Sequence, residues 1–294
     1  MLRSILVPTM GFSGDPAAME TAALIARHFD GHLECVHVRP DPQQILIQAA
    51  GYDMGLGMGT QMVIGDLIDV LQKEDAKRAE QSRKVFEAFC AREKLPVAPT
   101  PPGAQKGVTA GWQELTGREI DILIDVARVH DVAVVGHATP SGGLARETSG
   151  TMLVKSGRPL LLSPSRAPKE LGRRIAIAWK NTPEAARAVG AAMPFIDKAE
   201  RITVVSVAER EEETITSAEA LAKSLRWHGV DVDISYMAHP AGSIHDTIMR
   251  AAEDAKADLL VMGGYGHGRL SEYIFGGFTR HVLAGVRLPV FLVH

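Results

Sequence analysis

The chain has 294 residues, of which 46% are hydrophobic and 23% charged, and its formal net charge is -3. This length and composition are ordinary for a globular protein and predict two domains of about 150 residues each. The slight negative charge argues against a nucleic-acid-binding protein with a broad basic face, and no run of about 18 apolar residues predicts a transmembrane helix. We therefore expect a cytoplasmic protein that binds neither nucleic acid nor membrane.

The first part of the chain alternates short apolar runs with segments of helical spacing. Residues 4–8 and 33–38 are typical of buried parallel strands, and residues 17–29 between them have apolar residues at helical spacing. The further expected elements are a long helix from about Asp66 to Arg92, a helix over 118–128, a strand over 131–136, another helical segment and a strand over 159–162.

The same order recurs in the second part of the chain. Residues 174–178 predict a strand, and Thr182 and Pro183 are typical of the start of a helix, which Pro194 should distort or end. The matching pairs are Ile5 and Ile175, Pro16 and Pro183, and Val36 and Val205. The expected elements that follow are strands over 202–207, 258–263 and 289–293 and a helix over 243–256.

Each repeat therefore reads β-α-β-α-β-α-β-α-β, which predicts an α/β fold with two tandem doubly wound parallel sheets and right-handed crossovers. We expect the first repeat to span residues 1–165 and the second 173–294, with a linker at 163–172. The first repeat is longer because it contains the Gly- and Met-rich stretch Gly51–Gly59 and the long helix. The stretch could cover a ligand or bind a partner, although a flexible surface loop is the simpler interpretation.

Two smaller features have structural interpretations. Cys35 and Cys90 have no CxxC or zinc-ligand spacing, so we expect buried free thiols, with a disulfide as the alternative. The apolar residues of the long helix can be placed near one stripe and should pack on the core. This stripe comprises Leu67, Leu71, Ala79, Phe86 and Phe89.

The most specific motif follows the strand over 258–263. Its glycines are Gly263, Gly266 after two residues, and Gly276 after nine more. Glycines let the backbone approach a ligand, and free N–H groups at a helix start would form an anion site near Gly276–Thr279. Ligands of open α/β sheets also bind beyond the carboxyl ends of strands. The alternative is that these glycines only make turns and close helix–strand contacts.

This motif and the repeated β/α order resemble the universal stress protein family, whose nucleotide-binding members carry Gly, two residues, Gly, nine residues, Gly and Ser/Thr. The resemblance covers nearly the whole chain and implies a tandem member. It implies five strands per repeat in the order 3-2-1-4-5, an adenine nucleotide alpha hydrolase-like fold, and packing of the two repeats as a pseudo-dimer through their last strands.

The resemblance also implies that the second repeat binds ATP or a related adenine nucleotide, with or without Mg²⁺, and that no such ligand binds in the first repeat. Backbone groups after the second strand would meet the adenine, and the glycine loop would surround the phosphates. The implied positions are Ala178, Trp179, Lys180, Val207, Met262, Gly263, Gly266, His267, Gly276, Gly277, Phe278 and Thr279.

Two positions depart from the family's pattern. Lys180 stands where the family has Asp after the first strand, and lysine cannot accept a hydrogen bond. It could pair with a phosphate or occupy the pocket. Gly277 replaces the usual Ser/Thr, which removes one hydroxyl. Trp179 could stack on a base, with core packing as the alternative.

The first repeat departs further. Met10 stands where the acidic residue is expected, and Arg146 and Glu147 align with Gly276 and Gly277. A glutamate near the phosphate position would repel it. Ser149 alone opposite Thr279 does not restore the site, so we expect no ATP binding in this repeat.

We expect a stress-response binding or signalling module that forms an intramolecular pseudo-dimer and could form a homodimer. No general base or Mg²⁺-binding acidic pair is evident, so we expect at most weak ATP hydrolysis, no catalytic residue and no metal site. The alternatives are an interaction scaffold that binds no nucleotide, with Lys180 filling the pocket, and a sensor of another small ligand in the N-terminal repeat.

Overall fold

A computed structural model describes residues 1–41, 60–98, 107–136, 143–207, 211–237, 243–264, 282 and 286–294. The side chains of residues 60–69, 143–146 and 211–214 lie outside that description, as do the Gly51–Gly59 stretch and residues 265–281 and 283–285.

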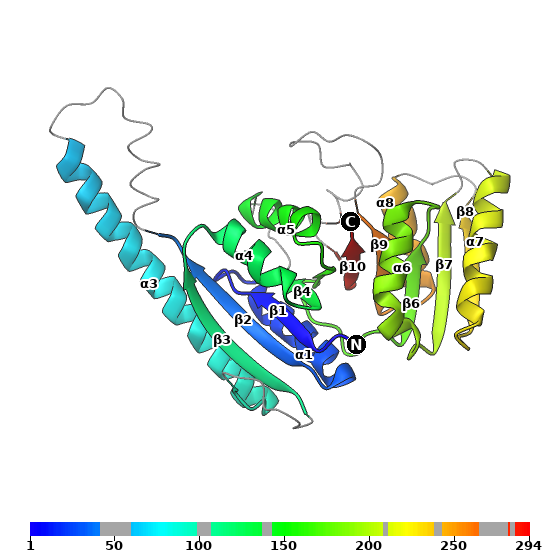
Figure 1. Cartoon of the computed structure of the whole chain (residues 1–294), viewed down its shortest axis with the longest axis horizontal. Helices are drawn as coiled ribbons and strands as arrows, with labels where there is room; N and C mark the ends of the chain where they lie inside the picture. The colour runs from blue at the N-terminus through cyan, green and yellow to red at the C-terminus, as the bar shows by residue number, and fades with distance from the viewer. Residues whose placement is uncertain are drawn as a thin grey trace.

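The N-terminal repeat contains five strands and four helices within the described residues (Figure 1). The strands are β1 (Ser4–Pro8), β2 (His32–Arg39), β3 (Thr109–Thr116), β4 (Val132–Val135) and β5 (Leu160–Leu162). The helices are α1 (Asp15–Phe29), α3 (Thr60–Glu93), α4 (Glu119–Arg128) and α5 (Gly143–Lys155). The predicted alternation of strands and helices is confirmed.

The C-terminal repeat has the same order, with three helices among its described residues. The strands are β6 (Arg174–Ala178), β7 (Arg201–Val207), β8 (Val232–Met237), β9 (Leu259–Gly263) and β10 (Val290–Val293). The helices are α6 (Pro183–Ile196), α7 (Glu211–Arg226) and α8 (Ile244–Asp254). The Thr182 hydroxyl caps α6 by accepting a hydrogen bond from the Ala185 N–H. Pro194 lies in the last turn of α6, which ends two residues later.

All ten strands belong to one sheet, in the order β3-β2-β1-β4-β5-β10-β9-β6-β7-β8. Each half has the predicted order 3-2-1-4-5 and is parallel throughout, and the two halves meet where β5 pairs with β10 in antiparallel register. The last strands therefore join the repeats, as the resemblance implies. Figure 1 shows both chain termini beside this join. The expected boundary between residues 165 and 173 stays a prediction.

Because the join is antiparallel, the two groups of parallel strands run in opposite directions across the sheet. The carboxyl ends of β1, β2 and β4 therefore lie at one edge of the sheet, where an edge means a row of strand ends and not an outermost strand. The carboxyl ends of β6, β7 and β9 lie at the opposite edge. Ligands of such sheets bind at the carboxyl ends. The two repeats thus place their candidate sites at opposite edges of one sheet.

Apolar helix faces cover both sides of the sheet. One core cluster contains residues of α1, α3, α6 and α7, and the other contains residues of α4, α5 and α8. Strand residues alternate between the clusters, as Ile5 and Leu6 do. In α3, Ala79, Phe86 and Phe89 are buried as expected, but Leu71 is exposed. That expectation fails at Leu71 because the N-terminal part of α3 projects past the sheet (Figure 1).

The two thiols are unpaired, as the sequence predicts. Cys35 and Cys90 are both buried and free. Burial raises the pKa of Cys35 well above its usual value and that of Cys90 to about 11. Both groups therefore remain neutral thiols at neutral pH and act as core residues.

The end of β4 packs on the start of α1 without room for a side chain. A Cβ atom at Gly136 would lie 2.5 Å from the carbonyl oxygen of Gly14, the N-cap residue of α1. Both atoms that such a Cβ would meet first belong to the backbone, so neither can rotate away. The strand and the helix can approach this closely only with glycine at this position.

We predict that Gly136→Ala lowers the free energy of unfolding by about 1–3 kcal/mol, because the extra methyl group forces the backbone apart. The matched control is Gly190→Ala inside α6, where an added Cβ meets nothing within 4 Å. It should stabilise the protein by about 0.5–1 kcal/mol, because alanine is the better helix residue. Urea unfolding of both variants measures the difference, and equal effects would contradict the steric explanation.

Candidate functional site

The predicted C-terminal site begins at the carboxyl ends of three neighbouring strands. Ala178 at the end of β6 lies opposite Val205 of β7 and Met262 of β9 in the sheet register. Val207 ends β7 at the same edge. Strand order reverses between β6 and β9, because the chain leaves β6 toward β7 on one side and later returns to β9 on the other. This is the position at which open α/β sheets bind ligands.

Trp179 is fixed by three hydrogen bonds just beyond β6. Its backbone N–H donates to the Val205 carbonyl at 2.8 Å, and its carbonyl accepts from the Ser206 hydroxyl at 3.1 Å. The indole Nε1–H donates to the Ser217 hydroxyl of α7 at 3.3 Å, and the ring packs against the core. These contacts favour the packing interpretation of Trp179 over base stacking.

Lys180 and Gly263 complete the described part of the predicted site. Lys180 is exposed at this edge of the sheet. A Cβ at Gly263 would lie 2.6 Å from the Ala185 backbone nitrogen and 2.7 Å from the Glu184 carbonyl carbon, at the start of α6. Gly263 therefore serves the same close strand–helix contact as Gly136, which is the packing alternative stated for the sequence motif.

The remaining predicted residues lie outside the described part of the chain. These residues are Gly266, His267, Gly276, Gly277, Phe278 and Thr279. The structure brings together Ala178, Trp179, Lys180, Val207, Met262 and Gly263 at one edge, and the assignment of nucleotide contacts to all twelve positions stays a prediction.

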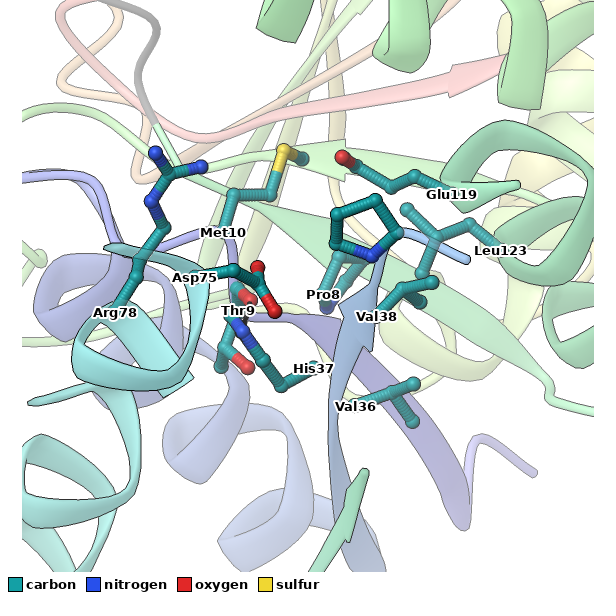
Figure 2. Close-up of a pocket in the computed structure, with 11 residues that line it drawn as sticks. Pro8, Thr9, Met10, Val36, His37, Val38, Asp75, Arg78, Glu119 and Leu123 are labelled. Atoms are coloured by element: carbon teal, nitrogen blue, oxygen red, sulfur yellow. Dashed lines mark hydrogen bonds between the residues drawn. The ribbon is translucent and has the colours of Figure 1, made fainter. Parts of the chain in front are cut away.

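The equivalent edge of the N-terminal repeat contains a small pocket of about 100 Å³ (Figure 2). The backbone geometry repeats, since the Thr9 N–H donates to the Val36 carbonyl at 2.8 Å as Trp179 does to Val205. The pocket is lined by the ends of β1 and β2 and by side chains of α3 and α4. The lining residues are Pro8, Thr9, Met10, Val36, His37, Val38, Pro40, Asp75, Arg78, Glu119 and Leu123.

His37, Asp75 and Glu119 are polar pocket residues that the sequence reasoning did not select. A signal existed at His37, because a histidine interrupts the otherwise apolar end of the strand over 33–38. In the sequence, Asp75 and Glu119 lie on helical segments at positions typical of solvent-exposed residues. Only the fold brings them to the strand ends. Of the predicted departures of this repeat, Met10 lines the pocket, whereas Glu147 and Ser149 are not among its lining residues. Glu147 is exposed, and Ser149 is buried in α5.

Asp15 shapes the turn that carries Met10 into the pocket. Its buried carboxylate accepts hydrogen bonds from the Gly11 and Phe12 N–H groups at 2.8 and 3.3 Å. Burial raises the pKa of Asp15 to about 6, and these backbone hydrogen bonds only partly oppose that rise. The turn next to the pocket therefore depends on a carboxyl group that titrates near neutral pH.

We predict that Asp15 makes stability decrease as the pH rises from about 4 to 7. The folded-state pKa of about 6 exceeds the ordinary value of 3.8, so protonation favours the folded state and the benefit is lost as pH passes 6. The shift corresponds to about 3 kcal/mol. Chemical unfolding of wild type and Asp15→Asn at several pH values isolates this contribution, since other groups cancel. The free energy of unfolding of wild type, minus that of Asp15→Asn, should fall as the pH rises from about 4 to 7. A difference that stays constant or rises over this range would contradict the prediction.

The described residues also bear on metal binding and on membrane insertion. Across these parts of the chain no group of three His, Cys, Asp or Glu side chains is placed to hold a metal ion. None of the helices described is both long enough and apolar enough to cross a membrane.

Comparison with known proteins gives a consistent family. The model of the universal stress protein family matches residues 172–294. The universal stress protein Slr1230 of Synechocystis is 22% identical over 299 residues, which cover 98% of this chain and 99% of that protein.

Solved structures show the same fold over the full length. A universal stress protein from Archaeoglobus fulgidus matches with a TM-score of 0.66 and 17% identity, covering 98% of this chain and 97% of the other. A putative universal stress protein from Pseudomonas aeruginosa matches with a TM-score of 0.52 and 17% identity, covering 99% and 93%. The family model thus matches the C-terminal repeat, and the solved structures show that the chain as a whole has the same fold as these proteins.

Proposed function

We propose that the protein is a stress-response binding module that holds an adenine nucleotide in its C-terminal repeat. The observation that carries this proposal is the convergence of Ala178, Val207 and Met262 at the strand-order reversal, immediately before the glycine motif. The family match over residues 172–294 covers the same repeat. The N-terminal repeat contributes the other half of the sheet and no nucleotide site.

Within the glycine motif, the later residues Gly276–Thr279 are the ones that we propose to bind phosphate. Gly263 is explained by packing against α6, so it supplies no argument for a ligand. The later residues Gly276–Thr279 lie outside the described part of the chain, and backbone N–H groups with a Thr hydroxyl suit phosphate oxygens. The proposal therefore depends on that segment, and the tests are directed at it.

The most direct test is mass spectrometry of small molecules released from the natively purified chain, followed by titration with ATP and Mg²⁺. We predict that Gly276→Glu reduces nucleotide affinity by about a hundredfold or more, because a carboxylate then repels the phosphates. The matched control is Ser224→Glu on the exposed side of α7, which adds the same charge away from the site. Unchanged affinity in Gly276→Glu, with the fold intact by circular dichroism, would refute the phosphate assignment.

Lys180 provides a second test of the same site. Its exposed side chain stands at the strand edge, where a cation can attract phosphate. We predict that Lys180→Asp weakens ATP binding by about tenfold at low ionic strength, and that the loss shrinks as salt screens the charges. Lys180→Met removes the charge without adding a carboxylate and should give a smaller loss. Tighter binding by Lys180→Asp would show instead that the lysine obstructs the site.

A further inference from the structure

The end of β9, at Gly263 and Gly264, is held between helices of both repeats. Successive residues of a strand point to opposite faces of a sheet. On one face, a Cβ atom at Gly263 would lie 2.6 Å from the Ala185 nitrogen at the start of α6. On the other face, a Cβ atom at Gly264 would lie 2.9 Å from Cδ2 of Leu153, which belongs to α5 of the N-terminal repeat. A side chain of the first repeat therefore packs directly on the glycine motif of the second.

Leu153 reaches Gly264 because the two repeats share the core beneath α5. The Leu153 side chain is 1% exposed and belongs to a cluster that also contains Met262 of β9 and Leu292 of β10. Figure 1 shows α5 next to β10 and the C-terminal end of the chain. Side chains in such a closely packed core have little room to move aside. The antiparallel pairing of β5 with β10 thus fixes Leu153 against the strand end of the other repeat.

The backbone of Gly264 is tied to the end of β10. Its N–H donates to the Val293 carbonyl at 2.7 Å, and its carbonyl accepts from Nδ1 of His294 at 3.2 Å. Arg187 of α6 in turn donates to the backbone oxygen of His294 at 3.1 Å. Gly264 is buried, and its φ does not lie in the left-handed region that favours glycine. The space that Leu153 occupies therefore explains why this residue is a glycine.

Gly264 is also the residue from which the chain enters the segment to which we assign the phosphate contacts. Gly266 follows two residues later, and Gly276–Thr279 come after it. A site binds its ligand tightly when the groups that contact the ligand are already held in place, because ordering them on binding costs free energy. A contact that fixes Gly264 should therefore raise the affinity of a site built on the residues that follow.

We propose that Leu153 is a positioning residue for the C-terminal nucleotide site, so that the N-terminal repeat sets the nucleotide affinity of the other repeat. This inference rests on the proposed adenine-nucleotide function. Leu153 acts through Gly264 and does not touch the nucleotide. Because coupling between two sites is reciprocal, nucleotide bound to the C-terminal repeat in turn tightens the packing around Leu153. The N-terminal repeat then responds to a nucleotide that it does not bind.

The first measurement is hydrogen exchange of the Gly264 amide in the full-length protein without nucleotide. This amide donates to the Val293 carbonyl, so its exchange rate reports local opening of the strand end. Leu153→Ala should raise the rate by about tenfold. The matched control is Leu33→Ala on β2, which removes an equally buried leucine two strands from the join. It should leave the Gly264 amide as in wild type.

The second measurement is the affinity of the same proteins for ATP with Mg²⁺. Leu153→Ala should weaken binding by about tenfold, whereas Leu33→Ala should bind as wild type does. Leu153→Val and Leu33→Val each remove a single methylene and keep the comparison available if an alanine variant does not fold. The expected loss for Leu153→Val is about threefold.

A pair of complementary substitutions separates positioning from general loss of stability. Gly264→Ala should weaken ATP binding by about tenfold, because the added methyl group meets Leu153. The double variant Gly264→Ala/Leu153→Ala restores space for that methyl group, so its loss should be smaller than the product of the two single losses. Gly190→Ala, whose added Cβ meets nothing within 4 Å, should combine with Leu153→Ala without any such rescue.

Each result decides the proposal. If wild type binds ATP but the Leu153 and Leu33 variants have equal affinities or equal Gly264 exchange rates, Leu153 is not a positioning residue and the proposed function still stands. Losses that simply multiply in the Gly264→Ala/Leu153→Ala variant lead to the same conclusion. If wild type binds no adenine nucleotide, the proposed function fails, and this inference fails with it.

Discussion

The antiparallel pairing of β5 with β10 is the contact on which the rest of the molecule depends. Leu160, Leu161 and Leu162 lie opposite Leu292, Phe291 and Val290, and all six are buried. Aromatic contacts extend the join into the helix layer, where Phe195 of α6 meets Phe29 of α1 edge to face at 5.1 Å and Phe291 of β10 at 6.1 Å. Lys198 closes the outer side by donating to the His28 carbonyl at 2.6 Å. These contacts join the five strands of each repeat into one continuous sheet.

This antiparallel join determines where each repeat places its candidate site. Antiparallel pairing turns one repeat over relative to the other, so their carboxyl edges face opposite ways. A single small ligand therefore cannot bridge both candidate sites. The C-terminal edge leads into the glycine-rich segment for which we propose phosphate binding, whereas the N-terminal edge is closed by α3 and α4 over a small pocket.

Much of the architecture could be predicted from the sequence because apolar strands and helical spacing are local signals. The strand order also followed, through the resemblance carried by the glycine motif. What the sequence could not supply was contact between distant residues. Gly263 looked like a ligand-loop glycine, and only the approach of α6 shows its steric role. Likewise, His37, Asp75 and Glu119 are far apart in the chain and become neighbours only at the strand ends.

A direct measurement of this division is the number of adenine nucleotides bound per chain, counted by native mass spectrometry or calorimetric titration of the full-length protein. One nucleotide per chain is expected, because the phosphate-binding segment is proposed for the C-terminal repeat alone. Two nucleotides per chain, or none, would contradict the assignment of a single nucleotide site to the C-terminal repeat.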